Sequence, residues 1–200
     1  MTMDIEHNLR RDDDGGKRPE RGRLYTYSGR ISYPDCAPSI QDIAVGLSRE
    51  CRYAGAGLRW WPVALHCFCV ADLLEKENKI HGLLHDSSEC LTGDVPKPVK
   101  TDEIEQFEEK MQARIYKNFK LTPPTEAQWA AVKRADRDVL RGEVYTVGTQ
   151  ALQEVYERCP QAERLVVKYL KQYPPMECIS PDGSCPIEFM RRFRIYKDLL

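Results

Sequence analysis

The stretch from His81 to Glu89 holds the side chains best suited to metal chemistry. His85 and Asp86 are adjacent, and Glu89 follows about one helical turn later. If the segment is helical, all three side chains can point into one cavity. A neutral imidazole beside a carboxylate suits Zn²⁺, Mn²⁺, Fe²⁺ or Co²⁺. A second carboxylate that need not bind the metal can act as a base for, or orient, a water bound to it.

A second set of charged residues follows directly. The segment from Gly93 to Lys100 reads as an ordered turn that carries one more carboxylate, Asp94, and the two cations Lys97 and Lys100. Metal-binding groups, acid–base carboxylates and cations so close together in the chain indicate hydrolysis of a phosphate ester.

Two distant residues can complete a metal-binding set. His66 falls on an apolar helical stripe with Val63 and Val70, which predicts that its imidazole is buried. Asp136 lies in helical phase with Val132 on another helix. A buried aspartate needs a partner, because burying a bare charge is expensive, and a shared divalent cation would supply one.

Two alternatives remain open at this point. Asp138 competes with Asp136 as a ligand, although the small Ala135 and the helical phase favour Asp136. His81 precedes His85 by four residues, a spacing that can bind zinc. The pair lacks the glutamate of a metalloprotease motif, and we expect His81 to pack or hydrogen-bond near the site instead.

The expected fold is an all-α helical bundle with a short N-terminal hairpin near residues 24–33. Residues 1–23 are predicted to be a flexible arm, 24–175 the main domain, and 176–200 a turn followed by a basic helix, with a solvated or oligomer-contacting face. The helices are expected over residues 39–51, 62–74, 80–91, 101–119, 125–140, 143–157, 162–173 and 188–200.

The bulk composition excludes several classes of protein. Thirty basic residues balance 31 acidic ones, so a stable nucleic-acid partner is not expected. No apolar run is long enough for a membrane span and no secretory signal is recognised, which predicts a cytoplasmic protein, in the host cytoplasm if it is viral. The eight cysteines are expected to be reduced. A bridge between Cys178 and Cys185 across the intervening turn is the alternative.

The order His66, then His85-Asp86, then Asp136 resembles the HD-domain superfamily of metal-dependent phosphohydrolases. The segment from His85 to Lys100 closely resembles the centre of bacterial HD-type 5'-deoxynucleotidases and of small phage HD proteins, including dATP triphosphohydrolases. The resemblance covers roughly residues 26–142. It differs in one place: Leu65 and Cys67 flank His66, where these families usually have Glu or Gln and Ser.

The resemblance implies one divalent metal ion, Zn²⁺, Co²⁺ or Mn²⁺ before Mg²⁺. It implies four ligands, which are His66, His85, Asp86 and Asp136. It further implies that Glu89 and Asp94 position the attacking water and handle protons. Self-association into a homo-oligomer is also expected from the resemblance.

For the substrate, the resemblance places Arg52 near the sugar and phosphate. Lys97 and Lys100 would add positive charge near the phosphates, although both can be ordinary solvated lysines. Tyr53 or Trp60 would stack on the base.

The expected function is therefore hydrolysis of deoxynucleotide phosphates. The enzyme would be a dNTP triphosphohydrolase with a preference for dATP, or a 5'-deoxynucleotidase. Two alternatives are an HD phosphodiesterase or guanosine-tetraphosphate hydrolase, and a nucleotide-binding HD domain without turnover.

Overall fold

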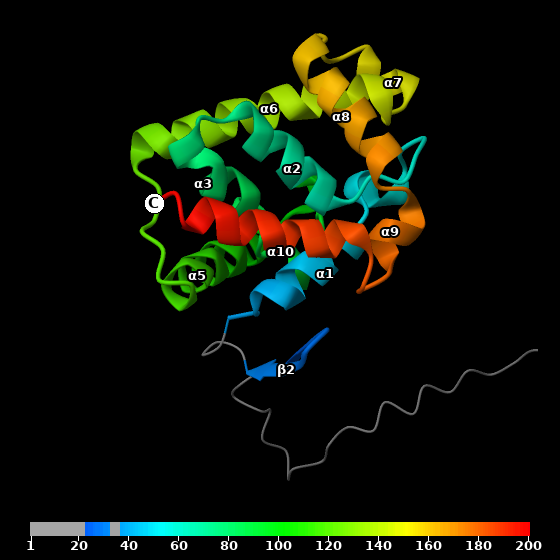
Figure 1. The fold of residues 1–200 in the computed structure, drawn as a ribbon. Coiled ribbons are helices and arrows are strands. Elements are labelled where there is room, and N and C mark those ends of the chain that lie inside the picture. Colours follow the sequence, from blue (N-terminus) through cyan, green and yellow to red (C-terminus); the bar gives the residue numbers. More distant parts are fainter. Residues whose placement is uncertain (1–22, 33–36) are drawn as a thin grey trace, which may run out of the picture.

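The protein is an all-α bundle built around one central helix, as the sequence predicts. The computed structural model describes residues 23–32 and 37–200, arranged as Figure 1 shows. In chain order the elements are β1 (Arg23–Thr26), β2 (Gly29–Ser32), α1 (Ile40–Arg49), η1 (Arg52–Gly55), α2 (Val63–Leu73), η2 (Lys76–Asn78), α3 (Lys79–Leu84), α4 (Glu89–Thr92), η3 (Lys97–Val99), α5 (Asp102–Asn118), α6 (Glu126–Thr146), α7 (Gln150–Gln153), α8 (Pro160–Gln172), α9 (Pro175–Ile179) and α10 (Ser184–Lys197). No helix in the described ranges is both long and apolar enough to cross a membrane.

The two short strands form an antiparallel hairpin that is tied to α1 by one carboxylate. Asp42 accepts hydrogen bonds from Ser28 at both oxygens, at 2.7 Å from the backbone N–H and 2.8 Å from the hydroxyl. The same carboxylate completes a capping box with Ser39 at the start of α1. Of the arm expected over residues 1–23, only Arg23 falls within the described residues, where it begins β1.

Helix α2 is the centre of the bundle. Its residues 63–71 are all buried, and it contacts α1, α3, α6, α8 and α10. A helix that is apolar on every side is stable only when other elements surround it. His66 interrupts this apolar sequence, so its imidazole must find its hydrogen-bond partners inside the protein.

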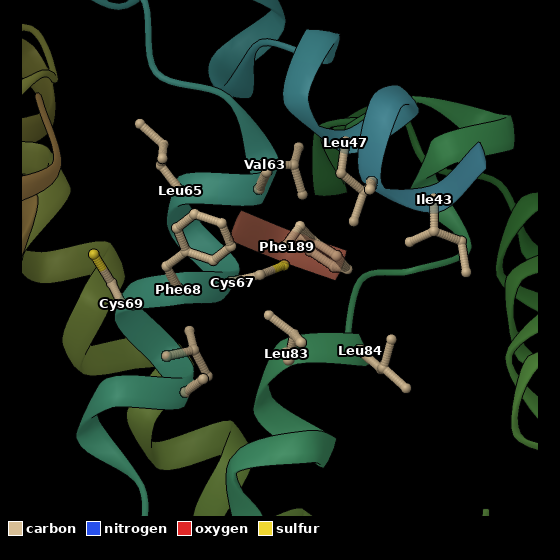
Figure 2. Packing of buried hydrophobic residues seen from close by; sticks show 14 of the residues in the cluster. Ile43, Leu47, Val63, Leu65, Cys67, Phe68, Cys69, Leu83, Leu84 and Phe189 are labelled. Atoms are coloured by element: carbon tan, nitrogen blue, oxygen red, sulfur yellow. The ribbon is translucent and has the colours of Figure 1, made fainter. Parts of the chain in front are cut away.

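The C-terminal helix belongs to the same core. Figure 2 shows Phe68 of α2 close to Phe189 of α10, and their ring centroids are 5.9 Å apart. Cys185 and Phe193 are also buried in this core. In Figure 1, α10 runs beside α1 and in front of α2 and α3, and it contacts all three. Residues 176–200, expected as a separate turn and helix, therefore help to build the main core.

The helix predicted over residues 80–91 is interrupted. α3 ends at Leu84, α4 begins at Glu89, and the residues between them form a turn. Gln112 stabilises this turn, because its Nε2 donates to the Leu84 carbonyl at 2.7 Å and its Oε1 accepts from the Ser87 hydroxyl at 2.9 Å. His85 and Asp86 consequently project from the end of a helix and not from its middle.

The prediction of separate helices over residues 125–140 and 143–157 is wrong. α6 continues to Thr146, and the later region contains only the short helix α7. Gly142 lies inside α6 where the helix meets α8: a Cβ atom added there would lie 2.6 Å from that of Ala162. The glycine permits close contact between two helices and does not end the first one.

Candidate metal centre

Ligand atoms from three parts of the chain converge on one point at the centre of the bundle. His66 Nε2, on α2, lies 3.2 Å from His85 Nε2 and 3.2 Å from Asp136 Oδ1 of α6. Asp86 Oδ2 lies 3.0 Å from His85 Nε2 and 3.6 Å from His66 Nε2. The four residues that the sequence analysis selected as ligands are therefore neighbours in space.

The donor set suits a divalent cation of borderline softness. Two imidazole nitrogens and two carboxylate oxygens are the ligands that Zn²⁺, Co²⁺, Mn²⁺ and Fe²⁺ accept. Among the described residues, two overlapping groups have the closeness that a metal ion needs, one of His66, His85 and Asp136, the other of Cys67, His85 and Asp86. The buried Cys67 thiol was not among the predicted ligands, and its sulfur lies 4.0 Å from His85 Nδ1.

The other ring nitrogen of each histidine has a partner that orients the ring. His85 Nδ1 lies 2.9 Å from the Gly82 carbonyl, which can only accept, so this nitrogen carries the hydrogen. His66 Nδ1 lies 2.7 Å from Glu143 Oε1. Such outer partners hold metal-binding imidazoles in place and tune their basicity.

Glu143 is the main site residue that the sequence analysis missed. Its side chain is 0% exposed, and it contacts His66, Arg52, Tyr53 and Trp61. A signal was available, because Glu143 follows Asp136 by seven residues, which places both on one face of a continuous helix. The wrong helix boundary near residue 140 hid this relation.

Arg52 lies between two carboxylates of the site. Its Nε donates to Glu143 Oε2 at 3.1 Å, and its Nη1 lies 4.0 Å from Asp86 Oδ2. Burial disfavours the charged guanidinium, but Glu143 and Asp94 outweigh this and raise the pKa of Arg52 above its usual value. The guanidinium therefore stays charged beside Glu143 and Asp86.

The turn after Arg52 is strained. Tyr53 and Ala54 have φ angles of 61° and 50°, in the left-handed region that costs a residue with a side chain roughly 1–2 kcal/mol. Asp94 Oδ2 accepts from the Tyr53 backbone N–H at 3.1 Å, and the Tyr53 hydroxyl donates to Glu143 at 2.9 Å. Strained residues that are held from two sides are common at functional sites.

Asp94 therefore faces the site, and its carboxylate also holds the backbone of the turn at Tyr53. Its own N–H donates to Glu50 Oε1 at 3.2 Å, so Glu50 fixes the loop that carries it. Gly93 adopts a φ of 77°, and a Cβ added there would lie 3.3 Å from Glu50 Oε1. Neither Glu50 nor the contact between Asp94 and Tyr53 was predicted from the sequence.

Glu89 is a buried carboxyl group with an unused oxygen. Its Oε2 is inaccessible to solvent and has no hydrogen-bond partner among the described residues. Burial, and then the charges of Asp86 and Asp94, raise the pKa of Glu89 to about 10. An unpartnered polar atom in this position calls for an explanation, such as a catalytic role or a small ligand beside it.

The two lysines have different surroundings. Lys97 is exposed at the start of η3. Lys100 Nζ donates to Glu108 Oε2 at 2.8 Å. Partial burial opposes the charge on Lys100, but Glu108 overcomes this and raises its pKa. Trp60, the other candidate for stacking on a base, is half-buried.

The ligand carboxylates are held ionised by the imidazoles. Burial alone would raise the pKa of Asp86, but His85, followed by His66 and Arg52, holds it well below the usual range. Burial would also raise the pKa of Asp136, but His66 and His85 lower it below its usual value. Burial and Arg52 oppose a charge on His66, but Glu143 and Asp136 raise its pKa to about 9.

Both alternatives for the ligand set now have a structural answer. His81 stacks on Tyr116 with its Nδ1 3.0 Å from the phenol oxygen, so it packs nearby and belongs to neither metal-binding group. Asp138 lies 3.4 Å from Arg141 Nη1 on α6. Cys178 and Cys185, the pair considered for a bridge, are both buried free thiols.

Fold and site together define an all-α protein with buried histidine, aspartate and cysteine groups that could hold a metal ion. No family model matches the chain. It is 33% identical over 131 residues to the "Uncharacterized protein YfdR" of Escherichia coli (strain K12), which covers 62% of this chain and 72% of that protein. The chain therefore belongs to the same family as YfdR, whose name states no activity.

Proposed function

We propose that this protein is a divalent-metal-dependent hydrolase of deoxynucleotide phosphates. One observation carries the proposal: carboxylate oxygens of Asp86 and Asp136 lie 3.0 to 3.9 Å from the Nε2 atoms of His66 and His85, beside the charged Arg52. The resemblance of the segment from His85 to Lys100 to HD-type nucleotidases supports the same reading.

The four ligand residues would hold Zn²⁺, Co²⁺ or Mn²⁺. Such a cation would supply Lewis-acid polarisation of a phosphoryl oxygen and would acidify a water molecule. The surrounding apolar helices keep bulk solvent from this point, since both ring side chains are 0% exposed. Charges in such a site act more strongly than in water.

Glu89 is the candidate for proton transfer. Its buried Oε2 has no partner within the described residues, so it is available to orient a water molecule and to hold or release a proton. Asp94 was expected to share this task. Its hydrogen bond to the Tyr53 N–H supports a second role, in which it shapes the turn that would face the substrate.

Arg52 would clamp the phosphate through its planar guanidinium. Lys100 and Lys97 would add positive charge at the mouth of the site. A deoxyribose substrate, and dATP in particular, follows from the resemblance alone, as does a homo-oligomeric state.

The test is a panel of deoxynucleoside mono- and triphosphates incubated with the purified protein and Co²⁺, Mn²⁺ or Zn²⁺, with products resolved by chromatography. Phosphate released from monophosphates would identify a 5'-deoxynucleotidase. Nucleoside plus triphosphate would identify a triphosphohydrolase. Turnover of cyclic dinucleotides or guanosine tetraphosphate instead would contradict the proposed substrate class, and binding without any turnover would contradict the enzyme.

A further inference from the structure

We propose that Glu143 is a positioning residue that aligns the metal ligand His66 and the phosphate-facing Arg52 at the same time. This inference rests on the function proposed above. It starts from the location of Glu143, a fully buried carboxylate that touches both halves of the site without belonging to the ligand set.

The two oxygens of Glu143 divide between the two halves. Oε1 lies 2.7 Å from Trp61 Nε1 and 2.7 Å from His66 Nδ1. Oε2 accepts from the Tyr53 hydroxyl at 2.9 Å and from Arg52 Nε at 3.1 Å. A carboxylate offers about four acceptor positions, so these four partners occupy all of them.

This arrangement determines the tautomer of His66. Trp61 and Arg52 can only donate, so each Glu143 oxygen is already an acceptor. His66 Nδ1 must then carry the hydrogen that points to Oε1. In the neutral ring the lone pair lies on Nε2, which faces His85, Asp86 and Asp136.

The same carboxylate also places the side chains that would meet the substrate. Holding Arg52 at Nε directs the end of its guanidinium toward Asp86, where Nη1 lies 4.0 Å from Oδ2. Holding the Tyr53 hydroxyl helps to keep the strained turn in its left-handed conformation. One side chain therefore determines how far the phosphate clamp lies from the metal ligands.

Glutamine cannot replace this carboxylate, although it has the same shape. It offers one acceptor oxygen and one NH₂ group, whereas four donors surround position 143. The amide oxygen can accept hydrogen bonds either on the side of His66 or on the side of Arg52. On the remaining side the NH₂ group would face other donors, and no hydrogen bond could form. Glu143→Gln should therefore damage one half of the site directly and misalign it relative to the other.

The experiment compares full-length wild-type protein with Glu143→Gln, Glu143→Asp and Tyr53→Phe. Glu163→Gln is the control, because the Glu163 side chain pairs with the exposed guanidinium of Arg158 and not with a residue of the site. Three properties are measured: Co²⁺ affinity, affinity for inorganic phosphate at saturating Co²⁺, and the ¹⁵N shifts of His66 in the metal-free protein at a pH high enough for its imidazole to be neutral. The ¹⁵N shifts report the tautomer, which a purely structural role of Glu143 would not change.

Glu143→Gln should weaken Co²⁺ binding by about 10–100-fold, as expected for an outer partner of a metal ligand. It should also weaken phosphate binding and reduce the Nδ1–H population of His66. Tyr53→Phe should weaken phosphate binding alone, and Glu163→Gln should change nothing. Glu143→Asp keeps the charge but is too short to reach both sides, so one affinity should fall while the protein stays folded.

Wild-type Co²⁺ affinity and an unchanged His66 tautomer in Glu143→Gln would overturn the inference. If that variant does not fold, wild-type values of both affinities in Glu143→Asp would do the same. A wild-type protein that binds no Co²⁺ would instead contradict the proposed function, and the tautomer measurement, which needs no metal, would still test the hydrogen bond to Glu143.

Discussion

Two polar clusters, one of them partly exposed, each include a side chain of the central helix α2, and they balance their charges in opposite ways. The Arg192 cluster consists of Asp72, Tyr169, Glu188 and Arg192. Arg192 donates to Asp72 Oδ1 at 2.8 Å, to Glu188 Oε1 at 2.8 Å and to the Tyr169 oxygen at 2.6 Å. Tyr169 in turn donates to Asp72, and the guanidinium lies 4.6 Å from the centre of the Phe68 ring.

The metal centre, two turns away on the same helix, has more carboxylates than cations. Asp86, Asp136 and Glu143 meet two imidazoles and the guanidinium of Arg52, and Glu89 has an oxygen without a partner in the described part of the chain. In the Arg192 cluster two carboxylates meet three cations, because Lys168 Nζ also lies 3.9 Å from Asp72 Oδ2 and Arg191 Nε donates to Glu188 Oε2 at 2.6 Å. The metal centre has fewer cations than carboxylates, and a bound divalent cation would supply the missing positive charge.

The largest effect should come from removing a ligand of the metal centre. Asp136→Ala should lower Co²⁺ affinity by more than the roughly 100-fold that an outer partner can account for. Asp138→Ala, two residues away on the same helix, should leave Co²⁺ affinity unchanged. Metal content after dialysis, measured by atomic absorption, checks both, and the reverse result would exchange the roles of the two aspartates.

Glu89→Gln should lower the rate of turnover without changing the amount of metal that the protein binds. Removing a group that transfers protons should lower kcat by about 10²–10⁴-fold. Metal stoichiometry should stay at the wild-type value, because Glu89 belongs to neither metal-binding group. Steady-state kinetics with the best nucleotide substrate checks the first expectation, and wild-type kcat would exclude Glu89 from the mechanism.

Arg192→Met should produce the opposite pattern in the Arg192 cluster. It removes the cation that Asp72 and Glu188 share and leaves them only the more exposed Lys168 and Arg191, and breaking such a buried pair costs about 3–5 kcal/mol. The estimate is an upper one, because Asp72 retains 20% of its side-chain exposure. Urea unfolding should show lower stability, while Co²⁺ affinity per folded molecule stays constant; a large loss of affinity would show that the clusters are coupled.

A smaller effect concerns pH and the metal-free protein. Because the folded pKa of Glu89 is about 10, well above the usual 4.5, the folded state binds more protons than the unfolded state between these values. Stability from this residue is present at acidic pH and declines as pH rises through that window. Chemical unfolding at several pH values should therefore show a negative slope that is steeper in the wild type than in Glu89→Gln, where His66, whose pKa is raised to about 9, still contributes.

The smallest effect should come from the two lysines. Lys97→Ala removes an exposed charge, so its effect on the KM for nucleotide should be a few-fold and should shrink at high salt. Lys100 is already paired with Glu108, so Lys100→Ala should also alter the loop that Glu108 supports. Kinetics at two ionic strengths distinguishes them, since the Lys97 effect should fade and part of the Lys100 effect should persist.

How much of this could be read from the sequence depends on how local each relation is. His85, Asp86 and Glu89 are neighbours in the chain, so their grouping was visible at once. His66 and Asp136 could be found from helical phase, which predicts that a side chain is buried but does not predict which residues it contacts. The helical fold followed from the apolar periodicity.

Relations that depend on packing were not accessible. Glu143 was separated from Asp136 by a wrong helix end, because nothing in the sequence shows that Gly142 lies against Ala162 of α8. The break between α3 and α4 depends on Gln112 from α5, which caps the turn. The hydrogen bond from the Tyr53 N–H to Asp94 joins two loops that are far apart in sequence.

The position of α6 has a mechanical consequence. This helix holds one imidazole at both edges: Asp136 Oδ1 lies 3.2 Å from His66 Nε2, and Glu143 Oε1 lies 2.7 Å from Nδ1. Sliding α6 along its axis by one residue, about 1.5 Å, would disrupt both contacts together. The His66 side chain therefore fixes the position of α6 along its axis relative to α2, because these two polar contacts tolerate less displacement than apolar packing does.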